Sequence, residues 1–180
     1  MAMLRVPISS RDHIKGPARA AVTLVEYGEF QCPHCGQAYW ILKDIEDSYG
    51  NDLRFVFRNF PLTEIHPFAM LAAEAAEAAD AQGMFWEMHG MLYENQDALD
   101  LASILEYGAS LDLDTESMRA DIESHRHLRK IQEDFMGGVR SGVNGTPCFF
   151  INGVRHDGPW DVASLSRAIA SSLRDSAYAR

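Results

Sequence analysis

The segment Ala21-Val-Thr-Leu-Val-Glu-Tyr27, with Cys32-Pro-His-Cys35 shortly after it, decides the fold of this chain. The first part is short, apolar and rich in β-branched residues, which is typical of a strand covered on both faces. The residues after Cys32 begin with a proline, which is favoured at the first position of a helix. Apolar side chains then recur at helical spacing up to Tyr49. The sequence therefore predicts a strand followed by a helix, with two cysteines at the junction.

A second strand follows this helix. Gly50-Asn51 ends the helix, and Leu53–Phe57 is again apolar. A strand–helix–strand unit usually pairs its strands in parallel through a right-handed crossover. The residues before the first strand are mixed and polar, and we expect Met1–Arg19 to be an extended lead-in.

Helical spacing dominates the middle of the chain, and strands return near its end. The pattern predicts helices over Phe68–Gln82, Met84–Glu94, Leu101–Leu111, Thr115–His125 and His127–Val139. Cys148–Ile151 is predicted to be a strand, and Asn152-Gly153 predicts a hairpin turn to an antiparallel partner. Asp161 is suited to cap a last helix that ends near Leu173. The predicted order is β-α-β, a group of helices, then β-β-α.

Composition and charge exclude several classes of protein. The 180 residues carry a formal net charge of −10, which argues against nucleic acid as a partner because phosphate binding needs a basic surface. No window approaches the ~18 apolar residues of a membrane span, and Met1–Gly16 lacks the apolar core of a signal peptide. We therefore expect a cytoplasmic location for the sequence as it stands, and a periplasmic or exported one if an N-terminal signal has been removed.

The cysteine pair carries the predicted chemistry. With Cys32 at the N-cap, its sulfur faces the first amides of the helix and the positive end of the helix dipole. Both effects lower the pKa of Cys32, which makes it a nucleophile at neutral pH. Cys35 lies one turn into the helix, where we expect it to be shielded and to act as the resolving thiol. His34 can add positive charge or a hydrogen-bond donor near the sulfur, and Pro33 fixes the start of the helix.

Glu26 is an acid within an otherwise apolar strand. We expect it to be buried, with a raised pKa, because burial disfavours the charged form. In one interpretation it takes and returns the proton of Cys35 through a water. In the other it is a structural acid, paired with Arg54 or Arg58.

Thr146-Pro147 enters the third strand directly after a turn, which makes it a candidate cis peptide bond. A cis bond there would expose the backbone of Thr146 for strand-like pairing with a substrate peptide. Cys148 follows at once. We interpret it as a small core residue, and the alternative is a third thiol that forms mixed disulfides.

These pieces together resemble the thioredoxin superfamily, and in particular its DsbA-like thiol–disulfide oxidoreductases. The resemblance rests on Thr23-Leu-Val-Glu-Tyr-Gly-Glu-Phe-Gln-Cys-Pro-His-Cys35, on Gly142-Val-Asn-Gly-Thr-Pro-Cys-Phe-Phe-Ile-Asn-Gly153, and on the length of the helical insertion between them. It implies that Cys32 is the nucleophile, that Cys35 is the resolving thiol, and that Pro147 is a cis-proline facing them. Two features depart from the family: Cys148 stands where an apolar residue or threonine is usual, and no export signal is visible.

The resemblance implies an α/β fold, with a thioredoxin-like domain over residues 1–60 and 142–180 and an all-helical insertion over residues 61–141. We expect a dithiol oxidase that acts on thiol-containing protein or peptide substrates, is served by a further redox partner, and needs no cofactor beyond the Cys32–Cys35 disulfide. Two alternatives stay open. One is a cytoplasmic reductase or isomerase on the same fold, and the other is a non-catalytic module that senses redox state or regulates a partner.

Three further patterns have a second interpretation. A Cys-x-x-Cys pair can be half of a zinc site, but a second ligand pair is missing and only His66 with His34 could contribute, so we expect no metal. His125 and His127 face different ways on a helix, and we expect them on a solvated face. The last pattern is an apolar stripe, which either lines a peptide groove or packs in the core, as we favour: Met84, Phe85, Met88, Met91 and Leu92.

Overall fold

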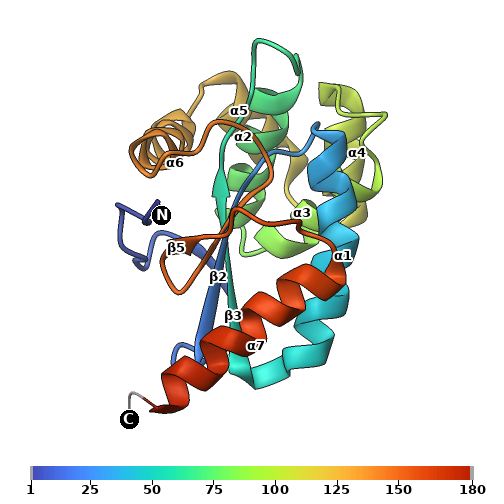
Figure 1. The fold of residues 1–180 in the computed structure, drawn as a ribbon. Coiled ribbons are helices and arrows are strands. Elements are labelled where there is room, and N and C mark those ends of the chain that lie inside the picture. Colours follow the sequence, from blue (N-terminus) through green and yellow to red (C-terminus); the bar gives the residue numbers. More distant parts are fainter. Residues whose placement is uncertain (1, 179–180) are drawn as a thin grey trace.

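A five-stranded mixed sheet forms the centre of the molecule in the computed structural model, which describes residues 2–178. The strands are β1 (His13–Lys15), β2 (Val22–Gly28), β3 (Leu53–Asn59), β4 (Cys148–Ile151) and β5 (Val154–Arg155), and they lie in the order β1-β3-β2-β4-β5. β2 and β3 are parallel, and every other neighbouring pair is antiparallel (Figure 1). The parallel pair and the β4–β5 hairpin confirm the topology predicted from the sequence.

Each face of the sheet carries an apolar layer. On one face, α1 (Pro33–Tyr49) and α7 (Val162–Tyr178) cover a core that includes Leu24 and Phe55. On the other face, residues from the N-terminal segment and from α6 (Leu128–Arg140) pack on a second, smaller core. Neighbouring residues of β2 and β3 therefore belong to different cores, because side chains alternate between the two faces of a strand.

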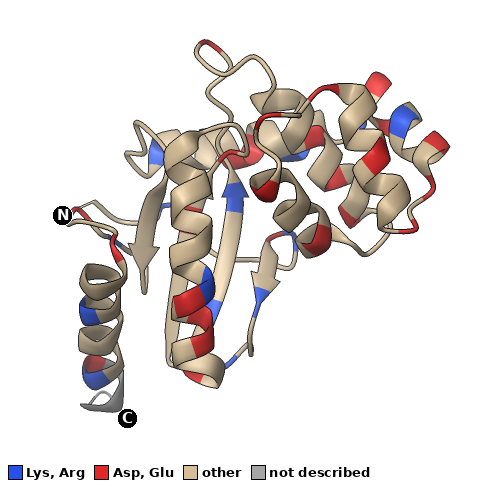
Figure 2. Ribbon diagram, turned by 90° about the vertical axis from the view of Figure 1, so that its right-hand side faces the viewer, with Lys and Arg blue, Asp and Glu red and all other residues tan. Residues whose placement is uncertain are grey.

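Helices α2 to α6 form an insert between β3 and β4, as the helical spacing predicted. The first four are α2 (Ala69–Asp80), α3 (Phe85–Glu94), α4 (Leu101–Ser110) and α5 (Thr115–Glu123). α2 contacts each of the others, and its buried alanines allow that close approach. Asp100 and Asp114 cap α4 and α5 by accepting hydrogen bonds from backbone amides. Acidic residues are spread over the insert, in keeping with the net charge of −10 (Figure 2).

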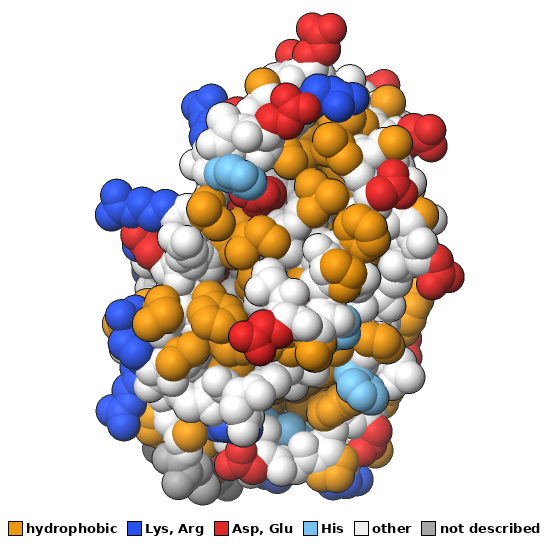
Figure 3. Space-filling model, turned by 90° about the horizontal axis from the view of Figure 1, so that it is seen from above, with side chains coloured by type: hydrophobic (Ala, Val, Ile, Leu, Met, Phe, Trp, Pro, Cys, Tyr) orange, Lys and Arg blue, Asp and Glu red, His pale blue; other side chains and the backbone are white. Residues whose placement is uncertain are grey.

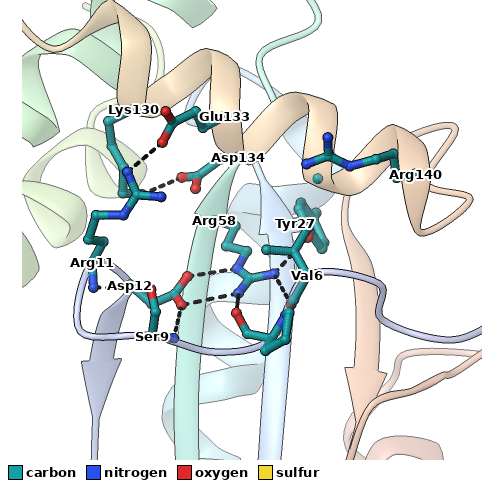
Figure 4. Close-up of a pocket in the computed structure, with 12 residues that line it drawn as sticks. Val6, Ser9, Arg11, Asp12, Tyr27, Arg58, Lys130, Glu133, Asp134 and Arg140 are labelled. Atoms are coloured by element: carbon teal, nitrogen blue, oxygen red, sulfur yellow. Dashed lines mark hydrogen bonds and ion pairs between the residues drawn. The ribbon is translucent and has the colours of Figure 1, made fainter.

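The N-terminal residues differ from the expected polar lead-in. His13–Lys15 forms β1, an edge strand that pairs with β3. Arg58 of β3 explains why this polar segment is fixed, because its five N–H groups all donate hydrogen bonds to it or to β2 (Figure 4). The acceptors are the Asp12 carboxylate at 2.7 and 3.1 Å, the carbonyls of Val6 and Pro7, and the Tyr27 hydroxyl. A cavity of about 280 Å³ lies beside this cluster, against α6.

The C-terminal elements match the prediction except in length. Both residues of the Asn152-Gly153 turn have positive φ, 47° and 81°, as the favoured two-residue hairpin turn requires. Asp161 accepts a hydrogen bond from the Ser164 amide, which confirms it as the cap of α7. This helix runs to Tyr178, past the predicted end near Leu173, because no glycine or proline interrupts it. Among residues 2–178 there is no helix with both the length and the apolar character needed to span a bilayer.

Candidate active site

The cysteine pair lies where β2 ends and α1 begins. Cys32 is the N-cap residue, with an extended backbone (φ −65°, ψ 121°), and Pro33 takes the first helical position, as predicted. Cys32 and Cys35 are both free thiols. Cys32 keeps 4% of its surface exposed and Cys35 none, while Pro33 and His34 between them are exposed. Of the two sulfurs, only that of Cys32 can meet a substrate without movement of the helix.

Hydrogen bonds lower the pKa of Cys32 to about 5. The largest contribution comes from the Cys35 thiol, which donates to the Cys32 sulfur; burial opposes it, and the Thr146 side chain and the amides of Cys35 and His34 add to it. The sequence predicted the direction and attributed it to the helix amides and the helix dipole, whereas the Cys35 thiol contributes more than these amides. With this pKa, Cys32 is almost entirely thiolate at pH 7, against a few per cent for an ordinary cysteine.

Cys35 is shifted the other way. Burial raises its pKa well above the usual range, and its hydrogen bond to Cys32 and the charge of Glu26 add to the effect. The reduced pair carries two protons, and loss of the first leaves the charge on Cys32 and the remaining hydrogen on Cys35, between the two sulfurs. This is the division of labour expected of a nucleophile and a resolving thiol.

Glu26 is 1% exposed, and burial is the main reason that its pKa is raised to about 8; the charges of Cys32 and Glu46 contribute less. Its Oε1 has no hydrogen-bond partner among the described residues. The alternative of a structural ion pair is wrong, because Arg54 donates to Thr23 and Ala18 instead and Arg58 binds Asp12. Glu26 is therefore a buried acid, electrostatically coupled to the thiols, that titrates near neutral pH.

The loop before β4 lies across from Cys32. Its Thr146–Pro147 peptide bond is cis, as predicted, and the Cys32 sulfur lies 3.5 Å from the Thr146 carbonyl oxygen, to which it donates when it is protonated. His34 approaches the same loop region, since its ring and that of Trp160 meet edge to face with centroids 6.2 Å apart. A cavity of about 240 Å³ opens there, and it is lined by Asn144–Phe149, Arg155, His156 and Trp160. The fold thus brings together two motifs that lie more than a hundred residues apart in the sequence.

An acid–imidazole pair beside the motif was not predicted. Glu29 is 1% exposed; its carboxylate pairs with Nδ1 of His66 and accepts from the Gln31 amide at 2.8 Å. The Gln31 side chain accepts from the Phe68 amide at 2.7 Å. These bonds fasten the segment before α2 to the turn that precedes Cys32. His66 was considered as a partner in a zinc site, and the described residues hold no group of three His, Cys, Asp or Glu suited to a metal.

The remaining residues singled out in the sequence pack in the cores of the fold, although Cys148 also lines the cavity beside the cis peptide bond. Cys148 is opposite Tyr27 in the sheet, and both belong to the core on the other face. Burial raises the pKa of the Cys148 thiol. In the apolar stripe of α3, Phe85, Met88 and Leu92 are buried, which confirms core packing.

The two histidines before α6 were expected on a solvated face, and this expectation is only half right. His125 is exposed, but its Nδ1 contacts the buried Glu74 carboxylate at 2.7 Å. His127 is half-buried and contacts Asp121 at 3.1 Å. Both acids come from helices of the insert, so these histidines hold the insert together. Sequence spacing does not show such contacts because the partners come from different helices or turns.

Comparisons with known proteins agree with this site. The Thioredoxin_4 family, described as thioredoxin, matches residues 9–171. A segment of a Na(+)/H(+) antiporter, NhaA 1 from Salinispora arenicola, is 46% identical over 171 residues, which cover 94% of this chain and 26% of that protein. A segment of NhaA 3 from Salinispora tropica has the same identity and coverage. The chain therefore spans about a quarter of the length of these curated relatives.

Solved structures share the fold over nearly the whole chain. BdbD from Bacillus subtilis in its oxidised form superimposes with a TM-score of 0.85 at 21% identity, covering 96% of this chain and 98% of that one. Alpha-DsbA1 from Wolbachia pipientis gives 0.84 at 20% identity, with coverages of 97% and 96%. A thioredoxin-like oxidoreductase from Silicibacter pomeroyi gives 0.82 at 25% identity, with coverages of 92% and 94%. The sheet with its helical insert is thus an architecture that these proteins share.

Proposed function

Because this chain belongs to the thioredoxin family and is a DsbA-like thiol–disulfide oxidoreductase by family and fold, we propose that it acts as a dithiol oxidase on protein substrates. The observation that supports this direction is the contrast between its two thiols. The pKa of Cys32 is lowered to about 5, while that of Cys35 is raised. Stabilising one thiolate stabilises the reduced enzyme, so the Cys32–Cys35 disulfide becomes a stronger oxidant.

The reaction starts from the oxidised enzyme. A substrate thiolate attacks the Cys32 sulfur, a mixed disulfide forms, and the electron pair of the broken Cys32–Cys35 bond leaves on Cys35. A second substrate thiolate then attacks the substrate sulfur of the mixed disulfide, and the electron pair leaves on Cys32. The substrate loses two electrons and gains a disulfide, and the enzyme is left as a dithiol. A separate redox partner must take up these two electrons to restore the enzyme disulfide.

Glu26 supplies the proton that this reaction needs. The Cys35 thiolate formed in the first step is fully buried and therefore unstable as an anion. A carboxyl with a pKa of about 8 is protonated at neutral pH, so Glu26 can give its proton to Cys35, directly or through a water. The proton returns to Glu26 when Cys35 is oxidised again. Glu26 thus keeps charge from building up on two buried groups at once.

Exposed apolar side chains beside the motif suit a protein substrate. Ile65 is 66% exposed and Phe68 is 39% exposed, and the Gln31–Phe68 hydrogen bond places their segment next to the turn before Cys32. Hydrophobic side chains gather on this end of the molecule (Figure 3). An extended peptide could pair with the backbone of Thr146 and rest on this surface, so that main-chain hydrogen bonds give affinity without sequence specificity.

The decisive measurement is the equilibrium constant between the enzyme and glutathione. At pH 7 a Cys32 pKa of about 5 stabilises the reduced form by at most about 2.7 kcal/mol, or about 60 mV, relative to an ordinary thiol, and water near the sulfur reduces this figure. We expect a reduction potential above about −200 mV. We expect rapid oxidation of a dithiol peptide that is lost in both Cys32→Ser and Cys35→Ser, since neither variant can form the enzyme disulfide. Cys35→Ser should instead trap a mixed disulfide when its Cys32 thiolate attacks the disulfide form of the peptide and releases one peptide thiol.

A potential well below about −200 mV would instead favour a reductase or isomerase that is fed by a cellular thiol pool. The location of the protein bears on this choice. In the cytoplasm the thiol pool is reducing and supports the reductase direction. In the periplasm or outside the cell, oxidation is sustained. An upstream export signal in the native gene would therefore support the oxidase.

A second candidate function is regulation of a membrane transporter. The observation that favours it is the identity of 46% to segments of proteins named as Na(+)/H(+) antiporters, of which this chain matches 26%. In this case the cysteine pair would sense redox state, and its oxidation would change the activity of the transporter. Insulin-reduction and dithiol-oxidation assays that are both silent with an intact and reactive Cys32 would favour this regulatory module over the oxidase.

A further inference from the structure

A glutamine of the helical insert holds the turn that carries the nucleophile. Gln96 lies just after α3, and its side-chain Nε2 donates to the carbonyl of Phe30 at 2.7 Å and to the carbonyl of Cys32 at 2.9 Å. Both hydrogens of the amide are thereby used. The two carbonyls lie on either side of Gln31, so a single side chain closes the turn between the end of β2 and the start of α1.

The position of Gln96 is itself fixed from both sides. Its Oε1 lies over Gly36 of α1, where a Cβ atom would come within 2.1 Å. Glycine is unfavourable inside a helix, and here its missing side chain leaves the room that Gln96 occupies. On the other side, the Ala98 amide bonds to the Asn95 carbonyl at 3.0 Å, and the Tyr107 hydroxyl of α4 bonds to the Ala98 carbonyl at 2.8 Å. The insert therefore supports Gln96 through its own hydrogen bonds.

We propose that Gln96 is a positioning residue of the redox site, through which the helical insert controls the reactivity of Cys32. The two carbonyl oxygens that converge on its amide repel one another once that amide is removed, and the turn then relaxes. The low pKa of Cys32 depends on the hydrogen bond from the Cys35 thiol and on the amides of Cys35 and His34 at the start of the helix, and a relaxed turn lengthens these contacts. The thiolate then loses part of its stabilisation. This inference deepens the proposed function, since it concerns how the nucleophile is tuned.

The test is the pH profile of Cys32 alkylation by iodoacetamide in the reduced, full-length Gln96→Leu variant. We expect the midpoint to rise by about one pH unit, which makes alkylation at pH 5 about fivefold slower than in the parent protein. Gln82→Leu is the matched control. Gln82 also bonds loop backbone, at the Asp114 carbonyl and amide (3.2 and 2.9 Å), and neither bond reaches the turn that carries Cys32. We expect this control to keep the parent midpoint.

Gly36→Ala provides a second variant in case Gln96→Leu does not fold. Alanine favours the helix, and its Cβ displaces Gln96 from its place, so the midpoint should rise here as well. Thermal unfolding of each variant separates loss of stability from loss of reactivity. A folded Gln96→Leu or Gly36→Ala protein with an unchanged alkylation midpoint would overturn the proposal. Alkylation needs no protein substrate, so this result is independent of whether the parent protein oxidises dithiols.

Discussion

Two buried ionisable side chains, Arg58 and Glu26, lie on opposite faces of the central strands, and only one of them is paired. Arg58 is 2% exposed, and all five of its N–H groups have acceptors. Glu26 is 1% exposed, and its Oε1 has no partner within residues 2–178. Buried charges are normally paired, because desolvation is costly. The paired cation fastens the N-terminal segment, whereas the unpaired acid lies on the face of the two thiols. The Arg58–Asp12 pair therefore stabilises the fold on one face. On the other face, Glu26 has no cationic partner and stays an acid that can titrate.

The largest effect on stability is expected at the Arg58–Asp12 pair. Arg58→Met leaves the Asp12 carboxylate, which is 5% exposed, without its cation. Breaking a buried pair in this way costs about 3–5 kcal/mol, which urea unfolding will measure. Asp12→Leu combined with Arg58→Met should cost much less than the sum of the two single changes, because neither charge is then left alone. Additive losses would show that the pair is not coupled. The alkylation profile of Cys32 should be unchanged in each folded variant.

Removal of the unpaired acid Glu26 should stabilise the protein, whereas removal of the paired Arg58 should destabilise it. The Glu26 pKa is raised from 4.5 to about 8 by burial, so the folded state binds more protons than the unfolded state between these values. The contribution of Glu26 to stability is then highest below about pH 4.5, falls as the pH rises, and levels off above about pH 8. Glu26→Gln removes this dependence and should stabilise the protein at pH 7 by up to about 3 kcal/mol. Urea unfolding of the parent protein and of Glu26→Gln at pH 5 and pH 8 measures this difference. Equal pH dependence in the two proteins would contradict the raised pKa of Glu26.

The same variant should be a poorer enzyme although it is more stable. Glutamine cannot give a proton to the Cys35 thiolate, so formation of the mixed disulfide slows at neutral pH by at least about tenfold. The measurement is the stopped-flow rate of reaction of the oxidised enzyme with a monothiol peptide between pH 6 and pH 9. A variant that is more stable and equally fast would mean that Glu26 has no part in proton transfer.

His13 is an intermediate case, since it is buried and ionisable like Glu26 but has acidic partners, Glu77 and Asp80. Burial lowers its pKa, but hydrogen bonds to Asp80 and Glu77 outweigh burial and leave the pKa raised above 6.5. Its contribution to stability is therefore fully present below about pH 6.5 and is lost as the pH rises through the folded pKa. His13→Gln should lose on the order of 1 kcal/mol at pH 6 and less at pH 9. A larger loss at pH 9 would reverse the expected sign.

The contrast between the faces also explains what the sequence could predict. The strand–helix–strand unit, the helices of the insert and the cis bond before Pro147 follow from local patterns: apolar periodicity, caps at Asp114 and Asp161, and turn residues. The burial of Glu26 was predictable for the same reason, since an acid in an apolar strand has no route to solvent. Local patterns specify which face a side chain occupies and how an element begins or ends.

Contacts between distant segments were not predictable in this way. β1 was missed because its polar residues are fixed by Arg58, which lies 46 positions after Asp12. Gln96 was missed because an amide in a loop has no periodicity, although Gly36 inside a helix was a detectable signal of close approach. The hydrogen bond from Cys35 lowers the pKa of Cys32 more than the helix amides do. It was not predictable because it depends on the orientation of a side chain, which sequence spacing does not specify.

The smallest effect is expected at the third cysteine. Cys148 shares the second core with Tyr27 and Val143, whereas the reactive pair belongs to the core on the other face. Cys148→Ala should keep the reduction potential and the oxidation rate of the parent and cost about 1 kcal/mol of stability or less. In the reduced parent, an aromatic disulfide reagent should consume the Cys32–Cys35 pair within seconds and reach Cys148 only after unfolding. Rapid native reaction of Cys148, or a shifted potential in Cys148→Ala, would place this thiol within the redox site and erase the distinction between the two faces.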